Sequence, residues 1–130
     1  MTTAVEDADR LYRRWNDDGL AVLGDCVDPA IVLIPDPLRP VESALRGLEG
    51  WERWVARWED SYEDVRITVD ALVPMDGEHV LALVSMAATP IGASDPLRWA
   101  AAHLWTLRDG RIAGWATHLD LAAARDTLDV

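Results

Sequence analysis

Asp36 is the first residue whose surroundings would let it take part in acid–base chemistry. It stands between Pro35 and Pro37, directly after residues 30–34, an aliphatic and mostly β-branched run that is typical of a buried strand. Because the two prolines restrict the backbone, the carboxylate would be held at the end of that strand, where it could act as a general base. The same pattern also fits an aspartate that only shapes a proline turn.

His103 is the second candidate, and it lies in a segment whose alternating pattern is typical of a strand. The side chains that would share its face are Trp99, Ala101, Trp105 and Leu107. A histidine on such an apolar face is either a core residue bonded to a backbone carbonyl or an acid–base group of a pocket. The sequence leaves both possibilities open.

His118 and Asp120 are two residues apart in the last predicted strand and would therefore share one face of it. An aspartate within hydrogen-bond reach raises the imidazolium fraction of a histidine and fixes its tautomer. We predict that both face the pocket, although Asp120 could instead cap a closing helical turn. The opposite face, with Trp115, Thr117 and Leu119, would then suit a dimer interface.

The chain has seven tryptophans and no phenylalanine. Their helical or strand spacing places most of them in a hydrophobic core. Flat indole rings also suit the walls of a pocket for an aromatic or polycyclic ligand. The tryptophans that we predict to contact such a ligand are Trp15, Trp51, Trp54, Trp58, Trp99 and Trp105.

Three helices and five strands are predicted to position these residues. Apolar residues recur at helical spacing over 3–16 and over 48–61, and a short helix is expected at 20–26. The predicted strands are residues 30–34, 63–74, 79–90, 97–108 and 111–120. Asp-Gly turns at 76–77 and 109–110 predict that the last four strands form an antiparallel meander. Helices segregated from such a sheet define the α+β class.

Length and charge limit the classes of function. The 130 residues suffice for a single domain, residues 1–130, and the formal net charge of −11 disfavours nucleic acids and anionic membranes as partners. Cys26 is the sole cysteine, which excludes an internal disulfide and fits a reducing compartment. The N-terminus lacks the apolar segment of a signal peptide, and no apolar run reaches the roughly 18 residues of a membrane span. We therefore predict a cytoplasmic protein.

Metal ions and organic cofactors are not expected. No cluster of His, Cys and carboxylate residues has the spacing of a metal site, and no glycine-rich phosphate loop follows a predicted strand. All twelve basic residues are arginine, which argues against a Schiff-base mechanism. Any reaction would therefore depend on side chains alone.

The order of the elements, together with LYRRWNDDG at 11–19, RGLEGW at 46–51 and HLWTLRDGRI at 103–112, resembles the SnoaL-like family of the nuclear transport factor 2-like superfamily. That superfamily includes ketosteroid isomerases and polyketide cyclases. The resemblance implies a cone-shaped barrel, in which a strongly bent, mixed but mainly antiparallel sheet wraps around three N-terminal helices. It also implies a pocket inside the cone and a homodimer formed through the outer face of the sheet.

The resemblance also implies roles for single residues. Asp36 is similar to the general base of ketosteroid isomerases, and Tyr12 to their oxyanion-binding tyrosine. His103 stands at a position that resembles that of their protonated carboxylic acid. Asp120 resembles the acid–base aspartate of SnoaL-like cyclases.

The sequence thus predicts a cofactor-independent acid–base enzyme, of cyclase or isomerase type, for a hydrophobic and polyketide-type carbonyl compound. Asp36 would remove a proton next to the carbonyl, while Tyr12 and His103 would stabilise the enolate. Asp120, with His118, would return the proton. A dehydratase for a cyclic hydroxyketone would use the same groups. A non-catalytic module that binds a small apolar ligand or serves for dimerisation is a third possibility.

Overall fold

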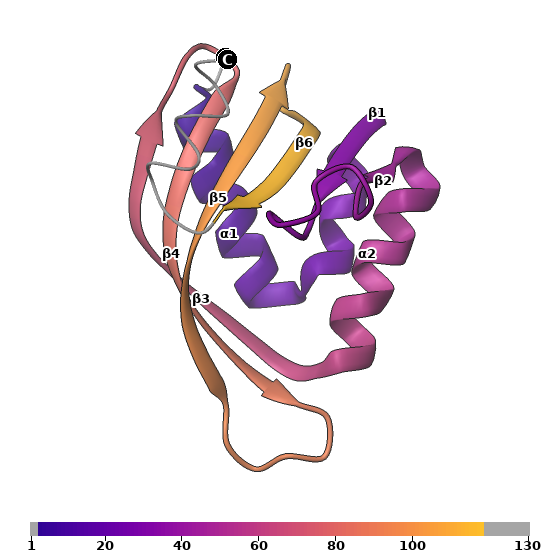
Figure 1. Ribbon diagram of the computed structural model, residues 1–130. Coiled ribbons are helices and arrows are strands. Elements are labelled where there is room, and N and C mark those ends of the chain that lie inside the picture. Colours follow the sequence, from indigo (N-terminus) through magenta and orange to yellow (C-terminus); the bar gives the residue numbers. More distant parts are fainter. Residues whose placement is uncertain (1–2, 119–130) are drawn as a thin grey trace.

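The computed structural model describes residues 3–118 of the chain. Along the sequence its elements are α1 (Ala4–Asp18), the 3₁₀ helix η1 (Leu20–Cys26), β1 (Val27–Ile34), β2 (Leu45–Arg46), α2 (Gly47–Ser61), β3 (Tyr62–Pro74), β4 (His79–Pro90), β5 (Leu97–Arg108) and β6 (Arg111–His118). Figure 1 shows the sheet curving around α1, with α2 beside β1 and β2. The α+β class is confirmed. No helix within these residues is long and apolar enough to cross a lipid bilayer.

The six strands form one sheet in the order β2-β1-β6-β5-β4-β3. β1 pairs with β6 in parallel, and every other neighbouring pair is antiparallel, so the sheet is mixed but mainly antiparallel, as predicted. Within residues 3–118, β2 and β3 are the two edges and do not pair with each other. The cone is therefore an open, curved sheet and not a closed barrel.

The sequence explains where α1 begins and ends. Thr3 and Glu6 form a capping box, in which Glu6 N donates to the Thr3 hydroxyl oxygen at 3.1 Å. Gly19 ends the helix with a φ of 93°, which glycine adopts without steric cost. The buried residues of this helix are Asp7, Ala8, Leu11, Tyr12 and Trp15. The buried face therefore carries Tyr12 into the interior of the curved sheet.

α2 turns its tryptophans toward the interior. Its buried residues are Gly50, Trp51, Trp54 and Val55. Trp54 and Trp58 are four residues apart, so they lie on one face of the helix, one turn from each other. A Cβ atom at Gly50 would lie 2.8 Å from the backbone carbonyl carbon of Leu45, so glycine at this position lets α2 pack closely against β2.

The edge strand β3 is covered by the end of α1. Asn16 Nδ2 donates to Ile67 O, and Ile67 N donates to Asn16 Oδ1, each at 2.8 Å. The side chain thus supplies the two backbone hydrogen bonds that a neighbouring strand would otherwise provide. This contact attaches α1 to the sheet one turn after Tyr12.

A β-bulge changes the alternation of β6. Thr106 pairs with Gly114, whereas the next residue of β5 already pairs with Ile112. Ala113 is therefore the extra residue of the bulge. Ile112 and Trp115 both belong to the buried core, although an uninterrupted strand would turn them to opposite faces. Beyond the bulge, it is the odd-numbered residues of β6 that face inward.

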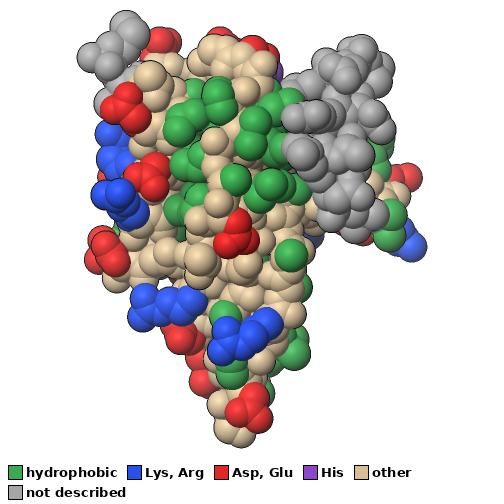
Figure 2. Space-filling view, turned by 90° about the vertical axis from the view of Figure 1, so that its left-hand side faces the viewer, with side chains coloured by type: hydrophobic (Ala, Val, Ile, Leu, Met, Phe, Trp, Pro, Cys, Tyr) green, Lys and Arg blue, Asp and Glu red, His purple; other side chains and the backbone are tan. Residues whose placement is uncertain are grey.

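The outer face of the sheet carries a second, smaller hydrophobic cluster. Its buried members are Leu81, Ala102 and Leu104, and the partly buried residues around them are Val73, Met75, Leu83 and Ala116. Figure 2, which faces the side of β3 and β4, shows hydrophobic side chains gathered in the upper half of this view, with basic side chains on its left and in its lower half.

The predicted elements differ from the structure in a few details. The short helix predicted at 20–26 is a 3₁₀ helix, and β1 begins at Val27, before the predicted start at residue 30. β2 was not predicted, because a strand of two residues leaves no periodic pattern in the sequence. Residues 119–120, the end of the last predicted strand, lie outside the described residues.

Candidate active site

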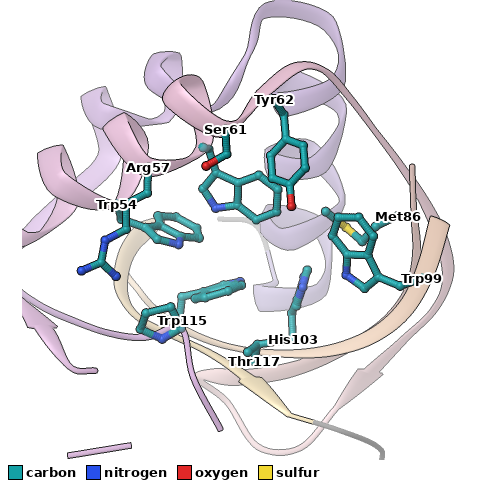
Figure 3. A pocket seen from close by; sticks show the side chains of 11 residues that line it. Trp54, Arg57, Ser61, Tyr62, Met86, Trp99, His103, Trp115 and Thr117 are labelled. Carbon is teal, nitrogen blue, oxygen red and sulfur yellow. The ribbon is translucent and has the colours of Figure 1, made fainter. Parts of the chain in front are cut away.

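A cavity of about 270 Å³ lies inside the curved sheet, between the second half of α2 and strands β4 to β6. Aromatic side chains form most of its wall (Figure 3). The lining rings belong to Trp54, Trp58, Tyr62, Trp99, His103 and Trp115, and the remaining lining residues are Pro35, Arg57, Ser61, Met86 and Thr117. The volume is near the lower end of the range for small-molecule sites.

Helical and strand periodicity together bring these side chains to one place. α2 contributes Trp54, Trp58 and Ser61, which follow one another at the spacing of a single helix face. From the sheet, His103 on β5 pairs directly with Thr117 on β6, so both side chains stand on the inner face. The cavity is therefore closed by α2 on one side and by the sheet on the other.

The aromatic rings contact one another around the cavity. The ring centroids of Trp54 and Trp115 are 4.5 Å apart, and those of Trp58 and Tyr62 are 5.4 Å apart. The His103 ring centroid lies 5.0 Å from that of Trp115. Rings packed in this way have little rotational freedom, so the wall is rigid and offers flat apolar surfaces to a ligand.

A chain of hydrogen bonds leads from the core to His103. Trp105 Nε1 donates to the Tyr12 hydroxyl oxygen at 2.8 Å, and the same oxygen is 2.8 Å from His103 Nδ1. The exposed fractions of Trp105, Tyr12 and His103 are 0%, 1% and 3%. Because solvent barely reaches these groups, each depends on the next one in the chain for its hydrogen bond.

This chain determines which ring nitrogen of His103 carries the proton. The Tyr12 oxygen already accepts from Trp105, and within residues 3–118 its own proton has His103 Nδ1 as acceptor. Nδ1 is then the unprotonated nitrogen, so the neutral ring carries its proton on Nε2. Nε2 has no partner in the described part of the chain, and the ring lines the cavity. The His103 ring therefore has an N–H donor available to a ligand.

Burial keeps both groups uncharged at neutral pH. Desolvation lowers the pKa of His103 to about 3. Desolvation also raises the pKa of Tyr12 above its usual value, and the hydrogen bond from Trp105 opposes only part of that change. His103 is accordingly a neutral donor and not an imidazolium ion, and the Tyr12 hydroxyl is engaged with His103 instead of facing a ligand.

Asp36 lies in the loop beside the cavity but does not line it. Its carboxylate oxygen Oδ1 accepts a hydrogen bond from Leu38 N at 2.9 Å, and its backbone N donates to Ser43 Oγ at 3.3 Å. These contacts are those of an aspartate that shapes a turn. The preceding residue, Pro35, does line the cavity.

His118 lies on the face of β6 that points away from the cavity. It pairs with Ala102, a member of the outer hydrophobic cluster, whereas Trp115 and Thr117 line the cavity. The faces predicted for this strand are thus reversed, because the bulge at Ala113 shifts the alternation by one residue. Trp115 and Thr117 are consequently not available for a dimer interface.

The expected pairing of His118 with Asp120 stays a prediction, because Asp120 and Leu119 lie outside the described residues. Desolvation lowers the pKa of His118, which is half-buried. Its Nε2 is buried and has no hydrogen-bond partner in the described part of the chain.

The tryptophans predicted to bind a ligand divide into two groups. Those that line the cavity are Trp54, Trp58 and Trp99. Those that are buried in the core are Trp15, Trp51 and Trp105. Trp115 and Tyr62 line the cavity but were not predicted to do so. The sequence feature that could have indicated Tyr62 is its spacing of four residues from Trp58. No such feature indicated Trp115, because the bulge reverses the alternation of β6 before it.

Carboxylates are missing from the lining that the structure describes. Among residues 3–118 there is also no group of three or more His, Cys, Asp or Glu side chains that could hold a metal ion. The cavity can thus hold a flat apolar molecule and donate a hydrogen bond from His103 to an oxygen of it. A base would have to come from a residue beside these lining groups.

Comparison with known proteins gives one sequence family and many similar folds. The sequence pattern of the SnoaL-like domain matches residues 8–115. An NTF2-like protein of unknown function from Burkholderia pseudomallei K96243 has a TM-score of 0.75 and 15% identity, over 98% of this chain and 97% of that one. No match was found among curated proteins.

Two other solved structures have similar folds. A protein from Jannaschia sp. CCS1, proposed to be a SnoaL-like polyketide cyclase, has a TM-score of 0.68 and 20% identity, over 94% of this chain and 88% of that one. An LEH-like epoxide hydrolase from M. tuberculosis has a TM-score of 0.71 and 15% identity, over 96% of this chain and 88% of that one. Such low identities establish the fold and not the reaction. With the domain pattern matched over most of its length, the chain belongs to the SnoaL-like domain family.

Proposed function

We propose that the cavity binds a flat, hydrophobic carbonyl compound of polyketide type and catalyses proton transfer at the carbon next to the carbonyl, without a cofactor. The observation that carries this proposal is the neutral N–H of His103 in an aromatic cavity, with its tautomer fixed by Tyr12 and Trp105. The reaction is then an isomerisation or a ring closure that passes through an enolate.

In this mechanism His103 Nε2–H donates to the carbonyl oxygen of the ligand. Loss of the neighbouring proton moves negative charge onto that oxygen, so the hydrogen bond is stronger in the transition state than in the ground state. Polarisation along the chain from Trp105 through Tyr12 strengthens the same donor. A preorganised donor of this kind contributes on the order of 10²-fold or more in rate.

The base in the proposal is Asp36. Its neighbour Pro35 lines the cavity, and the flanking prolines limit how far the loop can move. The Asp36 carboxylate would exchange its hydrogen bond from Leu38 N for the ligand proton. Asp120 is the proposed acid that returns the proton, on the strength of its resemblance to the cyclase aspartate, and His118 receives no role because it lies on the outer face.

Non-catalytic binding of a small apolar ligand is the second candidate. It is favoured by a specific observation, namely that no Asp or Glu of the described residues lines the cavity. A dehydratase would use the same donor and the same carboxylates, and it would be recognised by the loss of water from a hydroxyketone. A cytoplasmic location and a homodimer are further parts of the proposal, and sedimentation velocity would test the latter.

The decisive experiment follows His103 by ¹⁵N NMR while 1-tetralone, a bicyclic aromatic ketone, is added. We expect the free protein to show the Nε2–H tautomer and the Nε2 signal to shift on binding. In Tyr12→Phe and Trp105→Phe, the tautomer preference should weaken, because Nδ1 loses its donor or the donor loses its orientation. His103→Phe should bind 1-tetralone about 5- to 10-fold more weakly, for want of one hydrogen bond.

Proton transfer is measured separately as deuterium exchange of the protons next to the ketone in D₂O. The wild type should accelerate this exchange, and Asp36→Asn should reduce the acceleration by about 10²-fold while leaving the dissociation constant within about twofold. The same measurement on Asp120→Asn tests the second carboxylate. If 1-tetralone binds but its deuterium exchange is no faster than in buffer, the catalytic proposal is wrong and the cavity is a non-catalytic binding site.

A further inference from the structure

Arg57 is the one charged side chain that lines the cavity within residues 3–118. The other lining groups are aromatic, aliphatic, hydroxyl or thioether groups, and the His103 ring is neutral. Arg57 lies in the second half of α2, and Ser61, one turn later on the same helix face, also lines the cavity. One guanidinium and one hydroxyl of α2 are thus part of the lining of an otherwise mostly apolar cavity.

The charge of Arg57 is not neutralised by the residues that the structure describes. Its guanidinium makes no hydrogen bond or ion pair in that part of the chain. Arg53, one turn earlier on the same helix, provides the contrast, since its Nη2 is 3.0 Å from Glu49 Oε1. Arg53 is paired on its own helix, whereas the donors of Arg57 remain available to a ligand.

This positive charge is opposite in sign to that of the protein as a whole. The chain has 23 acidic residues against 12 basic ones, a net charge of −11, and such a molecule repels anions at long range. At the cavity the balance is reversed, because no Asp or Glu in the described part of the chain lines it. An acidic group of a ligand would therefore meet Arg57 without a competing carboxylate in the described lining of the cavity.

We infer that the ligand carries a carboxylate, which Arg57 binds at the edge of the cavity while the flat part of the molecule lies between the aromatic rings. This inference deepens the proposed function and rests on it for the position of the carbonyl oxygen at His103. Figure 3 shows the Arg57 side chain extending past Trp54 on the side of the cavity away from Trp99. The substrate class is thus an aromatic keto acid whose two polar ends are separated by hydrophobic rings.

A cationic ligand is the competing class, because aromatic rings also bind alkylammonium groups through their π faces. Arg57 would repel such a ligand, and the described lining offers no carboxylate that could offset the repulsion. The same two observations that favour an anion therefore disfavour a cation.

Three probes with one ring system test the inference on the full chain. 2-Naphthoate is negatively charged, methyl 2-naphthoate is neutral and (2-naphthylmethyl)trimethylammonium is positively charged. Isothermal titration calorimetry gives their dissociation constants at low and at physiological salt. We expect 2-naphthoate to bind about 5- to 10-fold more tightly than its ester at low salt. Because Arg57 is exposed, this advantage should shrink as salt is added.

Two variants of α2 assign the effect to one residue. Arg57→Gln keeps most of the side-chain stem and removes the charge, so it should weaken binding of 2-naphthoate about 5- to 10-fold and change binding of the ester by less than about twofold. Arg53→Gln removes an equal charge one turn away and outside the cavity, and it should change neither constant.

The outcomes separate this inference from the proposed function. Equal binding of acid and ester, tighter binding of the ammonium probe, or an equal effect of Arg53→Gln would overturn the carboxylate inference. In each of these cases a response of His103 Nε2 to 1-tetralone would still support the proposed function. If neither 1-tetralone nor any naphthalene probe binds, both are wrong.

Discussion

Burial decides what the His103 side chain can do. An exposed imidazole exchanges its proton near pH 6.5, whereas desolvation lowers the pKa of His103 to about 3. Near neutral pH the ring is therefore an acceptor at Nδ1, toward Tyr12, and a donor at Nε2, toward the cavity. In enzymes that form enolates, a neutral imidazole can stabilise the developing oxyanion.

We predict that protonation of His103 destabilises the protein in mild acid. In the unfolded chain the ring takes up a proton below about pH 6.5, but in the folded state it does so only near pH 3. Between these values the unfolded state binds more protons, so the free energy of unfolding is fully present above pH 6.5 and falls as the pH is lowered. The expected loss approaches about 1.4 kcal/mol per pH unit, measured by urea unfolding between pH 7 and 4.5.

His103→Phe is the control, because it removes this titrating group and should reduce the pH dependence over this window. A smaller slope of the same sign should remain, because desolvation also lowers the pKa of His118. The carboxyls of Asp25 and Asp76 do not interfere there. Hydrogen bonds from Arg14 to Asp25, and from the backbone of Glu78 and from His79 to Asp76, lower their pKa values. These carboxyls therefore add to the slope only below about pH 4. A variant with the wild-type slope would contradict the assignment to His103.

In the proposed function, Tyr12 and Trp105 would act through His103, as positioning residues. The resemblance to ketosteroid isomerases implied that the Tyr12 hydroxyl itself binds the ligand oxygen. In the structure this hydroxyl donates to His103 and accepts from Trp105, so it stands behind the group that faces the cavity. His103 Nε2–H, and not the Tyr12 hydroxyl, is therefore the donor that faces the cavity.

At the scale of elements, the bulge in β6 determines which side chains reach the cavity. It places Trp115 and Thr117 inside and His118 outside. Gly114 follows the extra residue, and a Cβ atom there would lie 3.1 Å from Thr106 Oγ1. Small residues at 113–114 therefore allow the close approach of β5, and they were the signal in the sequence for an interrupted alternation.

The contact between α1 and the edge strand β3 gives a prediction about stability. Asn16→Leu removes both hydrogen bonds to Ile67 and should cost about 2–3 kcal/mol of unfolding free energy, because it leaves a half-buried backbone N–H and C=O unpaired. Asn16→Asp keeps the acceptor for Ile67 N but turns a carboxylate oxygen toward Ile67 O, which also accepts, so it should not restore the wild-type stability. Urea unfolding at pH 7 measures both.

Asp17→Ala is the matched control, since this exposed neighbour on the same helix should change stability by less than about 0.5 kcal/mol. Hydrogen exchange of the Ile67 amide provides a local readout, and it should accelerate in Asn16→Leu before the core amides do. Equal stability of Asn16→Leu and the wild type would mean that α1 is held by its apolar face alone.

At the scale of the whole molecule, charge is the dominant feature. The net charge of −11 makes the folded state repel itself at low ionic strength. The surface ion pairs, such as Arg13 with Asp9 at 3.0 Å, are exposed and offset little of this.

We therefore predict that salt stabilises this protein. Raising NaCl from about 10 to about 200 mM should screen the repulsion and raise the Tm by a few degrees, on the order of 1 kcal/mol, in differential scanning calorimetry. KCl should act equally, because screening does not depend on the identity of a monovalent ion. A Tm that falls with both salts would mean that the attractive ion pairs dominate.

The sequence by itself predicted the long elements, the α+β class and part of the candidate site. Helical and strand periodicity are local patterns that reflect which face of an element is buried, so α1, α2 and the four long strands were predicted within a few residues. Tyr12 and His103 were recognised through their polar groups on apolar faces and through the resemblance to a known family.

Only the tertiary structure decided how these residues act. The hydrogen bond that fixes the His103 tautomer joins residues 91 positions apart in the chain. The inward face of Trp115 depends on the pairing of β6 with β5 and on the bulge between them. Within residues 3–118 the Arg57 guanidinium has no hydrogen-bond or ion-pair partner, and only the positions of its neighbours in space show this. Each property depends on groups that come into contact only when the chain folds. The local periodicity of the sequence therefore does not predict it.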